Sequence, residues 1–130
     1  MPSLAAIGIV TKDMNESVRF YRLLGLDVPD PTGDHLDVTL PGGIAVTWDT
    51  LELIKQIDPD WTEPSGHRMV LAFQCSSPGD VDAMHTRVVA AGFRSKKEPF
   101  DAFWGQRYAQ VIDPDDNIVD LFAPLPTPTA

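Results

Sequence analysis

Hydrophobic residues recur with helical spacing near the start of the chain. The stripe lies at intervals of four, three and three residues and consists of Met14, Val18, Tyr21 and Leu24. Such spacing places apolar side chains on one face of an α-helix. Asp13, with Glu16 three residues later, is a helix-start signal, and Gly25 is a stop signal. The pattern predicts a helix over residues 14–24.

Short apolar runs flank this helix. Residues 5–10, AAIGIV, are typical of a buried strand. Residues 35–40 and 44–50 lie on either side of the turn sequence Pro-Gly-Gly and predict two further strands. The first half of the chain therefore reads as a strand, a helix and a strand pair.

The second half repeats this order. Residues 69–75 predict a buried strand, and the cap sequence Ser-Pro-Gly-Asp follows at residues 77–80. The next apolar stripe, which predicts a helix ending at Gly92, consists of Val81, Met84, Val88 and Ala91. Residues 107–113 and 117–123 then predict a hairpin.

This internal repeat predicts an α+β fold of two βαβββ modules, at about residues 4–50 and 66–123. We expect one domain over residues 1–124, a linker at 51–65 with a short helix, and a flexible tail at 125–130. One sheet face in each module is covered by its own helix. The other faces, if the sheets curve toward each other, enclose a cavity.

Composition excludes several classes of function. The formal charge is −9 and the isoelectric point is near 4.5, so neither nucleic acid nor an anionic membrane is expected as partner. The single cysteine, Cys75, excludes an intrachain disulfide. No basic leader and no long apolar segment is found, so we expect a cytoplasmic protein.

Two segments resemble the vicinal oxygen chelate superfamily, which includes glyoxalase I, bleomycin-resistance proteins and extradiol dioxygenases. They are TKDMNESVRFYRLLGL at residues 11–26 and YAQVIDPDDNIVDLF at residues 108–122. The family's turn usually reads Asp-Pro-Asp-Gly-Asn, and Asp116 stands here at the glycine position. Asp tolerates the left-handed backbone that glycine adopts there.

A narrower resemblance, to the mitomycin-binding resistance proteins of that superfamily, rests on the order of TWDT, DPDW, GHR, WGQRYA and VDLFAPLP. It implies a non-catalytic homodimer that completes its cavities with both subunits. It also implies a ligand held between aromatic side chains, either a planar aromatic small molecule or a chromophore-bearing peptide antibiotic.

The family's enzymes hold a divalent metal with His and Glu side chains, and this chain departs from that pattern. The first-strand ligand position corresponds to Ala6, which has no donor atom, and the last-strand Glu corresponds to Asp120. The remaining position falls near Met69 or Val70, two or three residues from His67. We therefore predict no metal, no cofactor and no catalytic residue. We expect His85 to be partly exposed and without function.

The resemblance instead predicts a ligand site on the C-terminal hairpin. With Asp120 at the former metal position, strand alternation and the family register place Tyr108 and Gln110 on the same face. Trp104 and Phe103 precede the hairpin in a glycine-containing loop, where their rings can lean over the cleft. The same register places Arg107 on the other face, so we expect it to orient the ligand only if it turns inward.

Three residues outside the hairpin are further candidates for ligand contact. Trp48 is predicted either to pack in the core or to line the cavity. Trp61 is predicted either to cap the cleft or to pack at a dimer interface, and His35 to stack or hydrogen-bond at the start of a strand.

The favoured hypothesis is a protein that sequesters a flat antibiotic or related natural product as self-resistance. The alternatives are a metal-dependent glyoxalase or dioxygenase, a metal-free enzyme acting on a natural-product intermediate, and a module with an unrelated small ligand.

Overall fold

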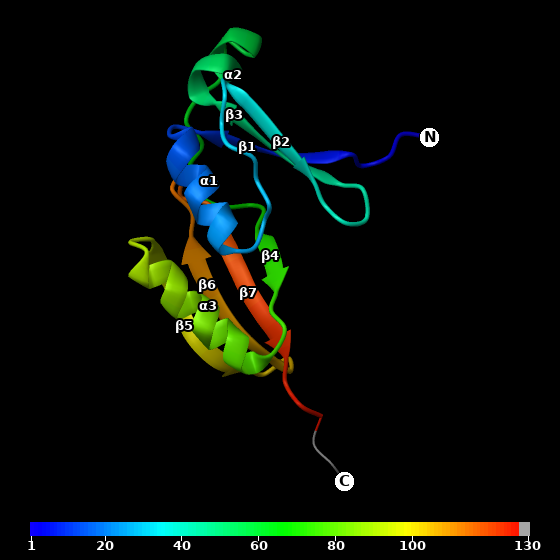
Figure 1. Ribbon diagram of the computed structural model, residues 1–130, viewed down its shortest axis with the longest axis vertical. Helices are drawn as coiled ribbons and strands as arrows, with labels where there is room; N and C mark the ends of the chain where they lie inside the picture. Colours follow the sequence, from blue (N-terminus) through cyan, green and yellow to red (C-terminus); the bar gives the residue numbers. More distant parts are fainter. Residues whose placement is uncertain (128–130) are drawn as a thin grey trace. The chain divides into compact units, whose positions relative to one another are not determined.

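The computed structural model describes residues 1–127 and divides the chain into two compact units, Met1–Ser65 and Gly66–Ala130 (Figure 1). Of the predicted tail at 125–130, residues 128–130 lie outside the described residues. Leu125, directly after the last strand, is anchored to the sheet, since its backbone N–H donates to the Gly105 carbonyl at 2.9 Å.

The first unit is built on a mixed sheet. Its elements are β1 (Ala6–Thr11), α1 (Met14–Leu23), β2 (His35–Thr39), β3 (Ala45–Thr50) and α2 (Leu51–Ile57). The strand order is β1-β3-β2, with β1 parallel and β2 antiparallel to β3. The described part of this sheet has three strands, one fewer than a complete module, because the chain turns into α2 directly after β3.

Helix α1 is bounded by the predicted start and stop residues, Asp13 and Gly25. The Asp13 carboxylate accepts a 3.1 Å hydrogen bond from the Glu16 backbone N–H, and Gly25 takes the left-handed φ of 95° that ends the helix. The whole predicted stripe of α1 is buried, together with Phe20. Tyr21 meets Trp48 of β3 edge to face, with ring centroids 5.8 Å apart.

The predicted short helix is present as α2, but none of its residues is buried. Thr50 caps it by accepting from the Leu53 N–H at 3.2 Å, and Ile57 at its end is 69% exposed. The helix therefore owes its position to its cap and to its neighbours β1 and β3 rather than to a buried apolar face.

The second unit is a complete βαβββ module. Its elements are β4 (Leu71–Gln74), α3 (Pro78–Ala90), β5 (Arg94–Ala102), β6 (Gln106–Ile112) and β7 (Ile118–Pro124). The sheet order is β4-β7-β6-β5; β4 is parallel to β7, and the other pairs are antiparallel. Together the two units give the α+β fold expected from the repeat.

Helix α3 covers one face of this sheet (Figure 1). Ser77 caps the helix by accepting from the Asp80 N–H at 3.1 Å. The core side chains between α3 and the covered face are almost entirely buried; they are Val81 and Val88 of the helix and Ala109, Val111, Val119, Leu121 and Ala123 of the sheet. Because side chains of a strand alternate between faces, the intervening residues of β6 and β7 point away from α3.

The prediction that His85 is partly exposed was wrong. This side chain is 8% exposed, on the buried side of α3. Its Nε2 lies 2.7 Å from the Ser95 hydroxyl on β5. The hydroxyl satisfies the ring nitrogen, which is the condition for burying a polar group inside a protein.

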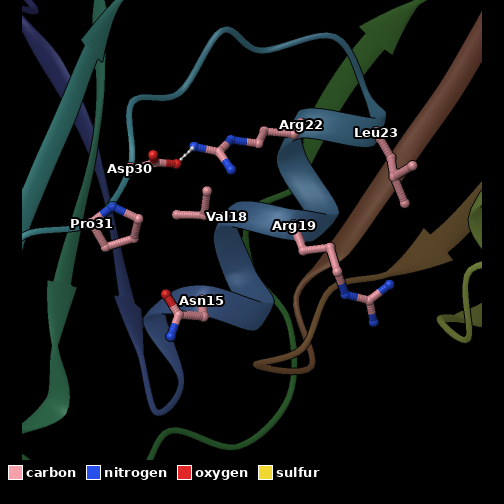
Figure 2. A pocket seen from close by; sticks show the side chains of 7 residues that line it. All are labelled: Asn15, Val18, Arg19, Arg22, Leu23, Asp30 and Pro31. Atoms are coloured by element: carbon pink, nitrogen blue, oxygen red, sulfur yellow. Dashed lines mark hydrogen bonds and ion pairs between the residues drawn. The ribbon is translucent and has the colours of Figure 1, made fainter.

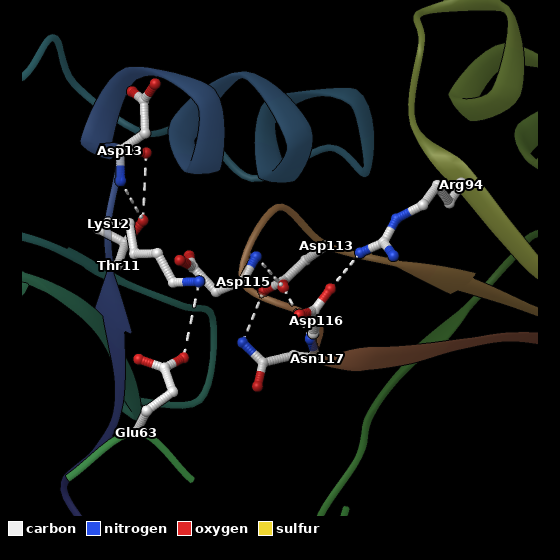
Figure 3. A network of polar contacts seen from close by, with 9 residues as sticks. All are labelled: Thr11, Lys12, Asp13, Glu63, Arg94, Asp113, Asp115, Asp116 and Asn117. Carbon is white, nitrogen blue, oxygen red and sulfur yellow. Dashed lines mark hydrogen bonds and ion pairs between the residues drawn. The ribbon is translucent and has the colours of Figure 1, made fainter. Parts of the chain in front are cut away.

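The turn between β6 and β7 is held by one buried carboxylate (Figure 3). Asp113 is 1% exposed and accepts from the backbone N–H groups of Asp115 at 2.8 Å and Asn117 at 2.9 Å. Asp116 adopts φ 67°, the left-handed geometry expected at the family's glycine position, and pairs with Arg94. The turn fixes the register in which β6 and β7 face each other.

Candidate ligand-binding face

The sheet face opposite α3, which we call the open face, carries two rows of side chains across its four strands. Residues paired directly across neighbouring strands lie side by side on one face. The first row, the aromatic row, is Gln74, Phe122, Tyr108 and Phe100. The second row, the polar row, is Ala72, Asp120, Gln110 and Lys97.

Rings gather at the β5–β6 end of the aromatic row. The Phe100 and Tyr108 centroids lie 5.8 Å apart, and Trp104, from the turn between these strands, lies 5.2 Å from Tyr108. Trp104 also lies 6.3 Å from Phe100 and 5.0 Å from Phe103, and every pair is edge to face. Ring pairs in this geometry are stabilised by the quadrupoles of their π-systems.

The tryptophan of this cluster is fixed but not covered. Its indole Nε1 donates a 2.8 Å hydrogen bond to Oε1 of Gln106, the first residue of β6. The side chain of Trp104 is nevertheless 49% exposed, and that of Phe103 is 98% exposed. Two large apolar rings at the same sheet edge therefore remain open to solvent, an arrangement more typical of a contact surface than of a core.

The polar row has a carboxylate at its centre. Gln110 Nε2 donates to Asp120 Oδ1 at 2.9 Å, so the predicted alignment of these residues on one face is confirmed. Burial raises the pKa of Tyr108 to about 12, and the hydrogen bond to Asp120 and the negative charge of Asp120 act in the same direction. The phenol therefore stays a neutral donor, and Asp120 is the acceptor of the group.

A cation sits at the other end of the polar row. Lys97 Nζ lies 4.9 Å from the centroid of the Phe100 ring. Between Lys97 and Phe100 the register of β5 shifts by a bulge, which brings both residues to the open face although three positions separate them.

Arg107 lies on the face opposite Tyr108, as the family register predicts, and it does not make the inward turn that a role in orienting a ligand would require. Its guanidinium Nε lies 2.9 Å from Asp82 of α3, and its Nη1 lies 3.1 Å from Asp101 of β5. Arg107 alternates with Tyr108 and so belongs to the covered face. It joins the helix to the sheet, and its ion pairs raise the pKa of its guanidinium.

Three of the predicted site residues belong to the first unit. His35 is exposed at the start of β2, with Nδ1 2.6 Å from Asp49 and Nε2 3.2 Å from Asp37. These hydrogen bonds, chiefly that to Asp49, raise the pKa of His35. Trp48 is fully buried, which favours the packing role over the cavity wall. Trp61 is half-buried in the linker.

The positions at which the family resemblance implies metal ligands carry few donors. Ala6 is the first residue of β1, and His67 lies exposed in the segment before β4. Within residues 1–127, no three His, Cys, Asp or Glu side chains are grouped so that they could hold a metal ion. Of the positions expected from the resemblance, Asp120 is the one with a carboxylate.

The first unit also has a surface hollow of about 600 Å³ beside α1, which sequence reasoning missed (Figure 2). Its lining residues are Asn15, Val18, Arg19, Arg22, Leu23, Asp30 and Pro31. Arg22 donates to the Val28 carbonyl through Nε at 2.9 Å and Nη2 at 2.7 Å, and pairs with Asp30 at 2.8 Å. These bonds tie the loop after α1 to the helix and occupy the guanidinium.

Comparisons with known proteins define the class. The model of the Glyoxalase/Bleomycin resistance protein/Dioxygenase superfamily matches residues 3–121, so the chain belongs to this superfamily. A comparison with curated proteins found no match. In the described residues, no helix is long and apolar enough to cross a membrane.

Solved structures share the fold over nearly the whole chain. A glyoxalase/bleomycin resistance protein/dioxygenase from Nocardioides is 26% identical, with all of this chain and 91% of that chain covered and a TM-score of 0.74. A family enzyme from Burkholderia phytofirmans is 20% identical, with 95% and 100% covered and a TM-score of 0.83. A glyoxalase-related enzyme from Fulvimarina pelagi is 21% identical, with 95% and 88% covered and a TM-score of 0.82.

Proposed function

We propose that this protein binds a planar aromatic small molecule on the open face of its second sheet and sequesters it without chemical conversion. The observation that carries the proposal is Trp104, whose ring is packed edge to face against Tyr108, held by Gln106, and still 49% exposed. A ring fixed in this way offers a flat surface to a flat ligand at little further entropic cost.

The energetics are sufficient for useful affinity. Burial of a few hundred Å² of apolar area contributes roughly 25 cal/mol per Å², and each aromatic pair adds about 0.5–1.5 kcal/mol. After the cost of association, such a site reaches micromolar affinity or better. The ligand class that fits is an antibiotic or related natural product with a flat chromophore, as the resemblance to the mitomycin-binding resistance proteins implies. Self-resistance of this kind would act in the cytoplasm.

The proposal includes a homodimer that completes the ligand cavity. It is supported by the family resemblance and by exposed apolar residues beside an edge strand. β4 is one of the two edge strands of its sheet, and Met69 and Val70 just before it are 78% and 48% exposed. A second copy of the chain would cover such residues, which otherwise invite non-specific association. Native mass spectrometry of freshly isolated protein would show the dimer and any co-purified small molecule together.

An enzyme of the same fold is the second candidate, because two of the similar structures are described as enzymes. The metal-dependent form of that chemistry needs convergent imidazole and carboxylate ligands, and Ala6 supplies none at the first position. A metal-free enzyme would use the Asp120, Gln110 and Tyr108 group as its polar machinery.

Tryptophan fluorescence tests the binding proposal directly. A panel of planar antibiotics is titrated into the protein, and saturable quenching with recovery of the unmodified compound is the expected result. Conversion of the compound to a product would support the enzyme instead. Elemental analysis of protein purified without chelator distinguishes the metal-dependent enzyme, since a stoichiometric bound metal would contradict sequestration.

A further inference from the structure

Asp120 is the only acidic side chain in the two rows of the open face, and it lacks a cationic partner. It is half-buried, and in the described part of the chain no Lys, Arg or His forms an ion pair with it. The cation on the same face, Lys97, stands over the Phe100 ring instead. A half-buried charge is costly unless it is paired, so an unpaired carboxylate here points to a partner from outside the chain.

The neighbours of Asp120 already supply neutral donors. Gln110 donates its amide N–H, and Tyr108 hydrogen-bonds through a phenol that keeps its proton. A carboxylate has about four acceptor positions, so two neutral donors orient it without saturating it. What the local group lacks is a positive charge.

We propose that the site selects planar aromatic cations, in which a protonated amine or amidine on the flat ring system pairs with Asp120. This inference rests on the proposed binding function and assigns the ligand's chemical class within it. The spacing fits, because the polar row lies two residues along the strands from the aromatic row, about 7 Å away. A ligand whose ring stacks on the aromatic row can therefore reach the Asp120 carboxylate with a substituent attached about one ring-width away.

Two other features favour a cation over a neutral or anionic ligand. The net charge of −9 attracts cations to the protein and repels anions. The exposed face of Trp104 is the best aromatic surface for a cation–π contact, because the indole ring carries the strongest negative potential on its face. A carboxylate on the ligand would instead meet Asp120 as a like charge.

Three planar tricyclic probes of similar size test the selection: 9-aminoacridine, which is cationic at neutral pH, acridone, which is neutral, and anthracene-9-carboxylate, which is anionic. Each is titrated calorimetrically into the wild-type protein, into Asp120→Asn, and into Glu52→Gln. Asp120→Asn keeps the shape and an acceptor for Gln110. Glu52→Gln removes the same charge from an exposed position of α2 and is the matched control.

We expect the cation to bind at least tenfold more tightly than acridone, and the anion most weakly. Asp120→Asn should lower the cation's affinity at least tenfold and acridone's less than threefold, whereas Glu52→Gln should change neither. Added salt should reduce the cation's advantage in the wild-type protein and in Glu52→Gln, and much less in Asp120→Asn.

The inference is overturned if the probes bind without charge preference, or if Asp120→Asn weakens all three equally; the proposed function would survive both results. If no planar probe and no planar antibiotic binds, the proposed function itself fails.

Discussion

Gln106 accepts a 2.8 Å hydrogen bond from the indole of Trp104, two residues earlier in the chain. The bond crosses the turn between β5 and β6 and ties a side chain of the turn to the first residue of a strand. The ring is thereby held against Tyr108 while its outer face stays open. Preorganisation of this kind reduces the entropy lost when a ligand binds.

Gln106→Leu should weaken the binding of a planar ligand roughly threefold to tenfold, because a hydrogen bond of about 1 kcal/mol no longer fixes the indole. The indole N–H of Trp104 should also exchange faster with solvent, which NMR of the free protein measures. Gln106→Glu keeps an acceptor and is the control. If leucine leaves both the exchange rate and the affinity unchanged, Gln106 does not position the ring.

Trp104→Ala should lower ligand affinity at least tenfold and leave the thermal unfolding temperature nearly unchanged, because the ring is half exposed and outside the core. Trp48→Ala is the contrast. Its ring is fully buried against Tyr21, so its removal should cost about 3–5 kcal/mol of stability. Calorimetry of binding and of unfolding separates the two effects. Equal destabilisation by both substitutions would show that Trp104 is a structural residue.

Much of this site is readable from the sequence, and the reason is periodicity. Side-chain alternation along each strand, together with the register of the family that the sequence resembles, placed Gln110 and Tyr108 on the same face as Asp120. The stripe on α1 was equally clear, since each of its predicted residues is buried.

The missing pieces are those without periodicity. β5 begins with the polar run Arg-Ser-Lys-Lys-Glu, is exposed over those residues and contains bulges, so no alternating pattern marked it. Because β5 was not predicted, the sequence could not show that Phe100 lies beside Tyr108 or that Lys97 lies beside Gln110. The hydrogen bond between His85 and Ser95 depends on the same strand, which explains why burial of this histidine was missed.

The phenol of Tyr108 should titrate at about pH 12, above the ordinary value of 10.0, because burial and Asp120 both disfavour the phenolate. The raised folded pKa means that its contribution to stability is complete below the unfolded pKa. That contribution is lost as the pH rises through the window from about 10 to about 12. Tyrosine ring NMR shifts follow the titration. Asp120→Asn should lower the pKa of Tyr108 only in part, since burial is the larger cause. An unchanged pKa would show that Asp120 does not act on the phenol.

His35 should stay protonated above its ordinary pKa of 6.5, held between Asp49 and Asp37. Because its folded pKa is raised, this ion pairing stabilises the fold fully below pH 6.5 and is lost as the pH rises through the folded value. The effect on stability should be small, since both histidine and Asp37 are exposed. Proton NMR of the imidazole measures the pKa, and Asp49→Asn should move it downward more than Asp37→Asn does.

Gly105→Ala should destabilise the protein by about 1–2 kcal/mol and weaken ligand binding as well. Gly105 has φ 92°, and a Cβ there would meet nothing within 4 Å, so the cost is backbone strain alone. Relief of that strain shifts the turn, and Trp104, the residue before Gly105, shifts with it. Gly33→Ala is the matched control, because its Cβ also meets nothing and its φ lies outside the left-handed range. That variant should be neutral or stabilised by up to about 1 kcal/mol. Denaturant unfolding of both variants decides the matter: equal stabilities would mean that the turn's left-handed backbone does not constrain Trp104.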